Sequence, residues 1–174
     1  MTGEGTGDFL GRVESAYQGE VYGEALYNGI ADMTTDPTRS KKWRVLADLE
    51  VVTKAQLRQL VAKLGGDIEE SVAAREEGLN DVGKYANLPW DVLMELYSKE
   101  LEPVIALYAE LERECQPEDA PTLRFLTEHE VVTKAFCDLE RAGQSDISIQ
   151  PTLDLIASAR QRLDSSIGNA KSTD

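Results

Sequence analysis

A six-residue segment occurs twice in the chain and constrains its organisation more than any other feature. Glu-Val-Val-Thr-Lys-Ala fills positions 50–55 and again 130–135, an offset of 80 residues. At the same offset, the pattern Tyr-x-x-Glu at 17–20 matches the one at 97–100. Independent helices would not keep one register, so the common offset indicates two related halves. The repeat predicts two helical hairpins joined by a long crossover between the second and third helices.

Helical periodicity covers most of the chain. Apolar residues recur at spacings of three and four, and β-branched residues never alternate with polar ones over a useful length, so we expect an all-α protein. Asp36 and Pro37 are typical of a helix start, and Gly65 and Gly143 are typical of helix ends. The predicted helices span about 8–33, 37–64, 89–115, 120–142 and 151–167, and the crossover 65–88 holds one short helix at about 68–77.

These spans predict three parts of the chain. Residues 1–7 form a flexible glycine-rich lead, and residues 8–143 form a four-helix bundle of two duplicated hairpins. Residues 144–174 contribute a short C-terminal helix and a polar tail.

Four glutamates interrupt the apolar stripes of the four long helices, each about midway along its helix. They are Glu20, Glu50, Glu100 and Glu130. A buried carboxylate is costly unless a proton, a cation or a metal ion compensates its charge. Four carboxylates from four helices are an arrangement that holds two divalent metal ions in a bundle core. The sequence therefore predicts a metal site at these residues, with Glu24, one turn after Glu20, as an additional candidate.

The repeated hairpins and their core acids resemble the ferritin-like superfamily, in particular its rubrerythrin-type di-iron carboxylate proteins. The resemblance covers about residues 8–141, including the short turns and the long crossover. In that family the first and third helices each supply one Glu, and the second and fourth each supply a Glu-x-x-His pair. The resemblance implies that Glu20 and Glu100 are the single acids and that Glu50 and Glu130 begin the pairs. It also implies a ferritin-like fold, an oxidoreductase ancestry and a homodimer.

Both histidines of that pattern are threonines in this chain, Thr53 and Thr133. A hydroxyl is a poor iron ligand compared with imidazole, so an oxygen-only site is expected to favour Mn²⁺, Mg²⁺ or Ca²⁺ over an Fe pair. Thr53 and Thr133 would then support the ligands or hold water. His129, the only histidine, is expected not to substitute, because it directly precedes Glu130 and points about a quarter-turn away.

A metal-free core is the alternative. Lys54 and Lys134 each follow a core glutamate by four residues, a favourable spacing for an ion pair along a helix. Their ammonium groups would take the place of the metal charge. The chain would then be a non-enzymatic bundle with a structural or interaction role, or it would bind a small ligand in the space left by the two missing imidazoles. Neither hypothesis identifies catalytic residues or a substrate.

The amino-acid composition limits the classes of binding partner that are expected. The 174 residues carry 32 acidic and 18 basic side chains, a net charge of −14, which argues against nucleic acid or an anionic membrane surface as the partner. Cys115 and Cys137 form no metal-binding spacing and no disulfide framework. A reducing cytoplasm is the compartment that fits this cysteine usage.

Overall fold

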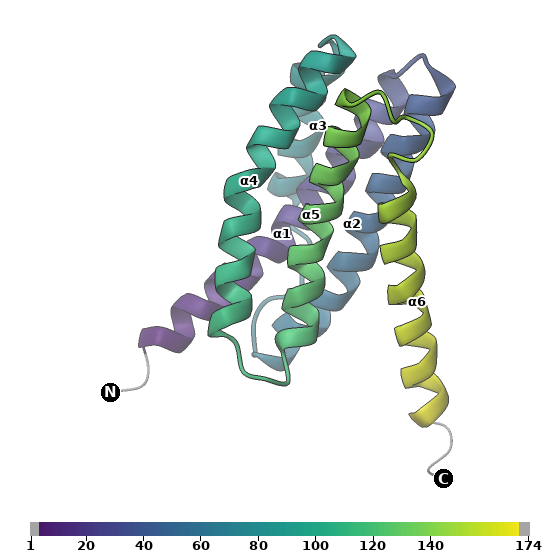
Figure 1. Cartoon of the computed structure of the whole chain (residues 1–174). Helices are drawn as coiled ribbons and strands as arrows, with labels where there is room; N and C mark the ends of the chain where they lie inside the picture. Colours follow the sequence, from purple (N-terminus) through teal and green to yellow (C-terminus); the bar gives the residue numbers. More distant parts are fainter. Residues whose placement is uncertain (1–3, 171–174) are drawn as a thin grey trace.

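The computed structural model describes residues 4–170, with side chains from 8 to 161 (Figure 1). This described part is all-α and contains no strand, as predicted. Helix α1 begins at Glu4, inside the predicted lead, and residues 1–3 of that lead and 171–174 of the polar tail lie outside the described residues. The helices are α1 (Glu4–Met33), α2 (Pro37–Lys63), α3 (Val72–Ala86), α4 (Trp90–Glu114), α5 (Ala120–Arg141) and α6 (Gln150–Ala170).

Local signals place the helix ends as expected. The Asp36 carboxylate accepts hydrogen bonds from the backbone amides of Thr38 at 2.8 Å and Arg39 at 3.0 Å, and so caps α2. Gly65 and Gly143 follow α2 and α5 with φ of 81° and 72°. That left-handed conformation strains any residue with a β-carbon, so glycine ends the second helix of both halves.

A polar layer divides the core. Helix α1 packs along α2, and α4 packs along α5. One apolar cluster surrounds Trp43 and another surrounds Leu57. Between these clusters lie four buried polar residues from α1, α2 and α5: Glu20, Glu50, His129 and Glu130.

The crossover contains a longer helix than predicted. The expected short helix at 68–77 is wrong in position, because α3 begins after its cap Ser71 and continues through Gly78 to Ala86. A β-carbon at position 78 would lie 2.4 Å from the carbonyl oxygen of Tyr22, so Gly78 lets α3 approach the backbone of α1. The sequence pattern at Gly78 indicated a loop, but this glycine serves close helix packing.

The C-terminal helix covers a flank of both hairpins. Apolar residues of α6, including Leu155 and Ile156, pack against Leu49 of α2 and Phe125 of α5. Helix α5 therefore contacts α4, α2 and α6. None of the helices within residues 4–170 combines the length and the apolar character needed to cross a membrane.

A buried ion pair fixes the connection between α5 and α6. Lys42 of α2 is 5% exposed, and its ammonium group lies 2.5 Å from the Glu140 carboxylate of α5. The same ammonium donates to the carbonyl oxygen of Ser145 at 2.6 Å and to the hydroxyl of Ser148 at 3.0 Å. Trp90 of α4 donates its indole N–H to Glu140 at 2.9 Å. One network thus joins three helices to the loop that precedes α6.

Candidate metal centre

Three buried side chains from three helices converge in the polar layer. Glu20 comes from α1, Glu50 from α2 and His129 from α5, and each residue is at most 4% exposed. One potential ligand atom of each lies within 4.8 Å of the others. His129 lies between the two carboxylates, with Nδ1 3.1 Å from Glu20 Oε2 and Nε2 3.1 Å from Glu50 Oε1. These residues could hold a metal ion, and we call them the Glu-Glu-His group.

The expectation that His129 would point away from the acids is wrong. Because α5 packs against three other helices, its buried face is wide. His129 follows buried Phe125 by four residues, and Glu130 follows buried Leu126 by four. The side chains of adjacent helical residues point about 100° apart around the helix axis, and the buried face of α5 is wide enough to include both directions. Both side chains therefore face the interior.

The polar atoms of this group are not all paired. His129 Nε2 and Glu50 Oε1 have hydrogen-bond geometry at 3.1 Å. His129 Nδ1 and Glu20 Oε2 are equally close but lack the alignment of a hydrogen bond, and neither has another partner among the described residues. Buried polar atoms normally have a hydrogen-bond partner. An imidazole nitrogen and a carboxylate oxygen without one are atoms of the kind that bind a metal ion.

Burial and charge set the protonation of the group. Burial alone lowers the pKa of His129, but the charges of Glu20, Glu50 and Glu130 outweigh it and hold that pKa well above its usual value. Burial and the charge of Glu20 raise the pKa of Glu50 well above its usual value. Both shifts favour the protonated forms of His129 and Glu50 in the metal-free group. A metal ion must displace these protons.

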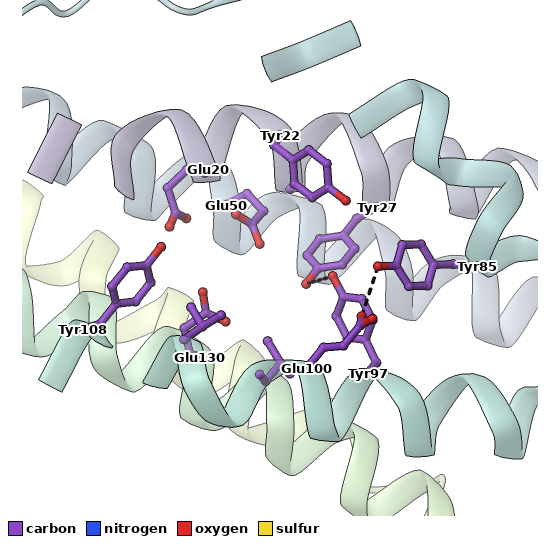
Figure 2. Close-up of a pocket in the computed structure, with 13 residues that line it drawn as sticks. Glu20, Tyr22, Tyr27, Glu50, Tyr85, Tyr97, Glu100, Tyr108 and Glu130 are labelled. Atoms are coloured by element: carbon purple, nitrogen blue, oxygen red, sulfur yellow. Dashed lines mark hydrogen bonds between the residues drawn. The ribbon is translucent and has the colours of Figure 1, made fainter. Parts of the chain in front are cut away.

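A cavity of about 230 Å³ adjoins the group between α1 and α4 (Figure 2). Glu20, Glu50, Glu130 and Tyr108 lie towards one end of it, and the Tyr108 hydroxyl points towards Glu20. Glu100 lies towards the other end with four further tyrosines, Tyr22, Tyr27, Tyr85 and Tyr97.

Glu130 faces this cavity without a partner. The residue is 9% exposed, and its carboxylate makes no hydrogen bond or ion pair with the described side chains. Burial raises the pKa of Glu130 to about 7, although the charge of His129 acts in the opposite direction. Tyr108, only 8% exposed, likewise has no hydrogen bond from its hydroxyl to a described residue. Tyr108 was not among the predicted site residues, although it continues the buried stripe of α4 at Leu101 and Leu111.

Glu100 does not join the Glu-Glu-His group. Its side chain is 40% exposed, and its carboxylate accepts a hydrogen bond from the Tyr85 hydroxyl at 3.0 Å. The Lys84 ammonium lies 4.0 Å from its other oxygen. Of the four predicted metal acids, the structure thus brings Glu20 and Glu50 together, leaves Glu130 facing the cavity, and places Glu100 towards the far end.

The two lysines pair with acids outside the group. The Lys54 ammonium lies 2.5 Å from the Glu24 carboxylate and 2.7 Å from that of Glu70, so Glu24 is already neutralised by a cation. The Lys134 ammonium lies 2.7 Å from Asp138. Among the described side chains, neither lysine forms an ion pair with any of the four predicted metal acids. The lysines therefore do not replace a metal charge in the way the alternative hypothesis required.

The two threonines are satisfied within their own helices. Thr53 donates its hydroxyl proton to the Leu49 carbonyl at 2.9 Å, and Thr133 donates to the His129 carbonyl at 3.0 Å. The group that could hold a metal ion includes an imidazole, from position 129, and so differs from the oxygen-only donor set that was expected. Two carboxylates with one imidazole suit Fe²⁺, Mn²⁺ or Zn²⁺ better than Mg²⁺ or Ca²⁺.

Comparison of the chain with protein families, curated proteins and solved structures finds no match. The resemblance to the ferritin-like superfamily therefore stays a prediction.

Proposed function

We propose that this protein binds one divalent transition-metal ion through Glu20, Glu50 and His129. The observation that carries the proposal is the convergence of three buried ligands in which Glu20 Oε2 and His129 Nδ1 lack hydrogen-bond partners. Histidine nitrogen favours Fe²⁺, Mn²⁺ or Zn²⁺ over Mg²⁺ and Ca²⁺. A bound ion of this kind would supply Lewis acidity and, if it is iron or manganese, one-electron redox chemistry.

The neighbouring residues would complete the site. Glu130 offers an unpaired carboxylate from the same helix as His129, either as a further ligand or as a proton acceptor beside the ion. Tyr108 offers a hydroxyl directed towards Glu20. Both side chains line the cavity, which would give a small molecule access to the open side of the ion.

We further propose a distant relation to ferritin-like, rubrerythrin-type proteins with a reduced site. The repeated hexapeptide, the two hairpins and the central acids support this relation. A pair of metal ions is not part of the proposal, because Thr53 and Thr133 replace two ligands and Glu100 is hydrogen-bonded to Tyr85. One ion per chain is the expected stoichiometry, and metal binding is proposed without an assigned reaction.

Titration of chelator-treated protein tests the metal proposal. Isothermal calorimetry with Mn²⁺ and Zn²⁺, and anaerobically with Fe²⁺, is expected to give one site per chain, with Mg²⁺ and Ca²⁺ binding far more weakly. Glu20→Gln and His129→Gln are expected to abolish this site. Glu24→Gln is the matched control, since it removes the same charge one turn along α1 and is expected to retain the metal. Absence of binding by wild-type protein, or equal losses in Glu20→Gln and Glu24→Gln, would falsify the proposal.

A metal-free bundle is the second candidate, favoured by the position of His129 midway between two carboxylates at 3.1 Å from each. In this state an imidazolium neutralises the core and the site is structural. Nitrogen NMR of the histidine ring distinguishes the two proposals. If the His129 ring stays doubly protonated at pH 7 in the presence of excess Zn²⁺, the structural role is supported. If the ring loses one proton when Zn²⁺ is added, the metal site is supported.

A further inference from the structure

The cavity provides more space and more negative charge than a single metal ion uses. Its volume is about 230 Å³, whereas one water molecule needs only about 10–15 Å³ of such space. With a divalent ion on Glu20, Glu50 and a neutral His129, the carboxylate of Glu130 still adds negative charge to the cavity lining, whereas Glu100 is paired with Lys84. Without a metal, the His129 imidazolium is the only positive side chain among the buried residues of the polar layer. In both states the cavity favours a cation.

Glu130 is the acid best placed to receive that cation. It is nine-tenths buried, lines the cavity and has no hydrogen bond or ion pair with a described side chain. Glu130 is not one of the three residues of the Glu-Glu-His group. A buried, unpaired carboxylate gains most from a ligand that brings a positive charge.

The remainder of the cavity is built from aromatic rings. The Tyr27 and Tyr97 rings meet edge to face with centroids 5.9 Å apart, and their hydroxyls are hydrogen-bonded at 2.9 Å. The Tyr85 ring packs edge-on to Tyr97 at 5.5 Å. The Lys84 ammonium lies 4.6 Å from the Tyr85 ring centroid, so the Tyr85 ring already has a cation partner, whereas Tyr27 and Tyr97 have none among the described residues. Rings of this kind bind alkylammonium groups through their negative faces and through apolar contact.

We propose that the cavity binds a small organic ammonium ion, with its charge beside Glu130 and its alkyl groups against the rings of Tyr27 and Tyr97. The site would select for positive charge combined with apolar surface, which a hydrated metal ion does not offer. Neutral molecules of the same shape lose the attraction to Glu130, and anions are repelled by the acids. In the metal-free protein Glu130 is available to the ammonium ion, so binding does not require the metal ion.

Choline and its neutral carbon analogue, 3,3-dimethylbutan-1-ol, form the test pair. The measurement is calorimetry at pH 8 on the full chain, treated with chelator and dialysed. Choline is expected to bind once per chain and at least about tenfold more tightly than the neutral analogue. Equal binding of the two compounds, or no binding of choline at 20 mM, would overturn the proposal without any variant being needed.

Two variants of α5 locate the site. Glu130→Gln is expected to weaken choline binding by about tenfold or more. Glu128→Gln removes the same charge from the exposed face of the same helix and is expected to bind choline as the wild type does. Equal weakening in both variants would mean that choline responds only to overall charge, and would also overturn the proposal. Metal titrations of the same preparations report separately on the Glu-Glu-His group, so failure of one proposal is distinguishable from failure of the other.

Discussion

Gly23 of α1 and the carboxyl group of Glu50 of α2 are in direct contact. A β-carbon at position 23 would lie 2.6 Å from both Cδ and Oε2 of Glu50. Real β-carbons do not approach other atoms so closely, so hydrogen is the only substituent at position 23 that leaves Glu50 in place. The backbone of α1 therefore forms one wall of the candidate metal centre.

Gly23→Ala is expected to displace Glu50 and to weaken metal binding at least tenfold, because a ligand carboxylate would move away from His129. Gly11→Ala, on the same helix, has nothing within 4 Å of the added methyl group. This control is expected to keep wild-type metal affinity and to gain up to about 1 kcal/mol of stability from helix propensity. Calorimetric metal titration and thermal unfolding check both variants. Unchanged metal affinity in Gly23→Ala would contradict the role assigned to the contact.

The metal-free protein is expected to lose stability as the pH rises through 7. The pKa of Glu130 is about 7 when folded, against an ordinary value of 4.5, so the folded state binds this proton more tightly. The resulting stabilisation is fully present below pH 4.5 and is lost as the pH rises through 7, by at most about 3 kcal/mol. Urea unfolding of the wild type, Glu130→Gln and Glu128→Gln between pH 4.5 and 8.5 measures it. Only Glu130→Gln should show a flatter profile, and parallel profiles in all three would refute the prediction.

Breaking the buried ion pair of Lys42 and Glu140 is expected to be costly. Lys42→Met leaves the Glu140 carboxylate buried without its cation, which should lower the free energy of unfolding by about 3 kcal/mol. Lys41→Met, at the exposed neighbouring position, should change it by less than about 0.5 kcal/mol. Replacing both partners with Lys42→Met and Glu140→Leu should recover part of the loss. Equal effects of the two single lysine variants would show that the pair contributes nothing measurable.

The two cysteines are expected to differ in reactivity. Cys137 is fully buried, and burial raises the pKa of its thiol to about 12, so almost no thiolate forms at pH 8. Cys115 is partly exposed, although burial raises the pKa of its thiol as well. A disulfide reagent should modify one thiol per chain in the native protein and the second only in denaturant. Modification of both at the same rate would indicate that α5 opens readily around Cys137.

Most of the helices could be predicted because their signals are local. The 3–4 spacing, the cap at Asp36 and the glycines at 65 and 143 act within one or two turns, and the structure confirms them. Glycines inside helices were harder to interpret. Gly78 has an ordinary negative φ and is needed for contact with Tyr22, a residue 56 positions away, so nothing near it in the sequence distinguishes it from a turn glycine.

The candidate site could be predicted only in part for a related reason. Glu20 and Glu50 continue the 3–4 spacing of the buried residues in their own helices, and periodicity identifies such positions. His129 is buried because α6 and α2 widen the interior face of α5, and that packing has no signature within α5 itself. Glu100 had the correct periodicity but found a hydrogen-bond partner in Tyr85 of α3, a helix whose extent was predicted incorrectly.

The glutamates of the two hexapeptide copies have different surroundings in the structure. Glu50 is enclosed by Gly23 and His129, whereas Glu130, in identical local sequence, faces open space. The two copies thus have different surroundings, and those of Glu50 include a residue of the other half. In an evolutionary comparison, position 129 should consequently vary together with positions 20 and 50 rather than with its own repeat partner, residue 49.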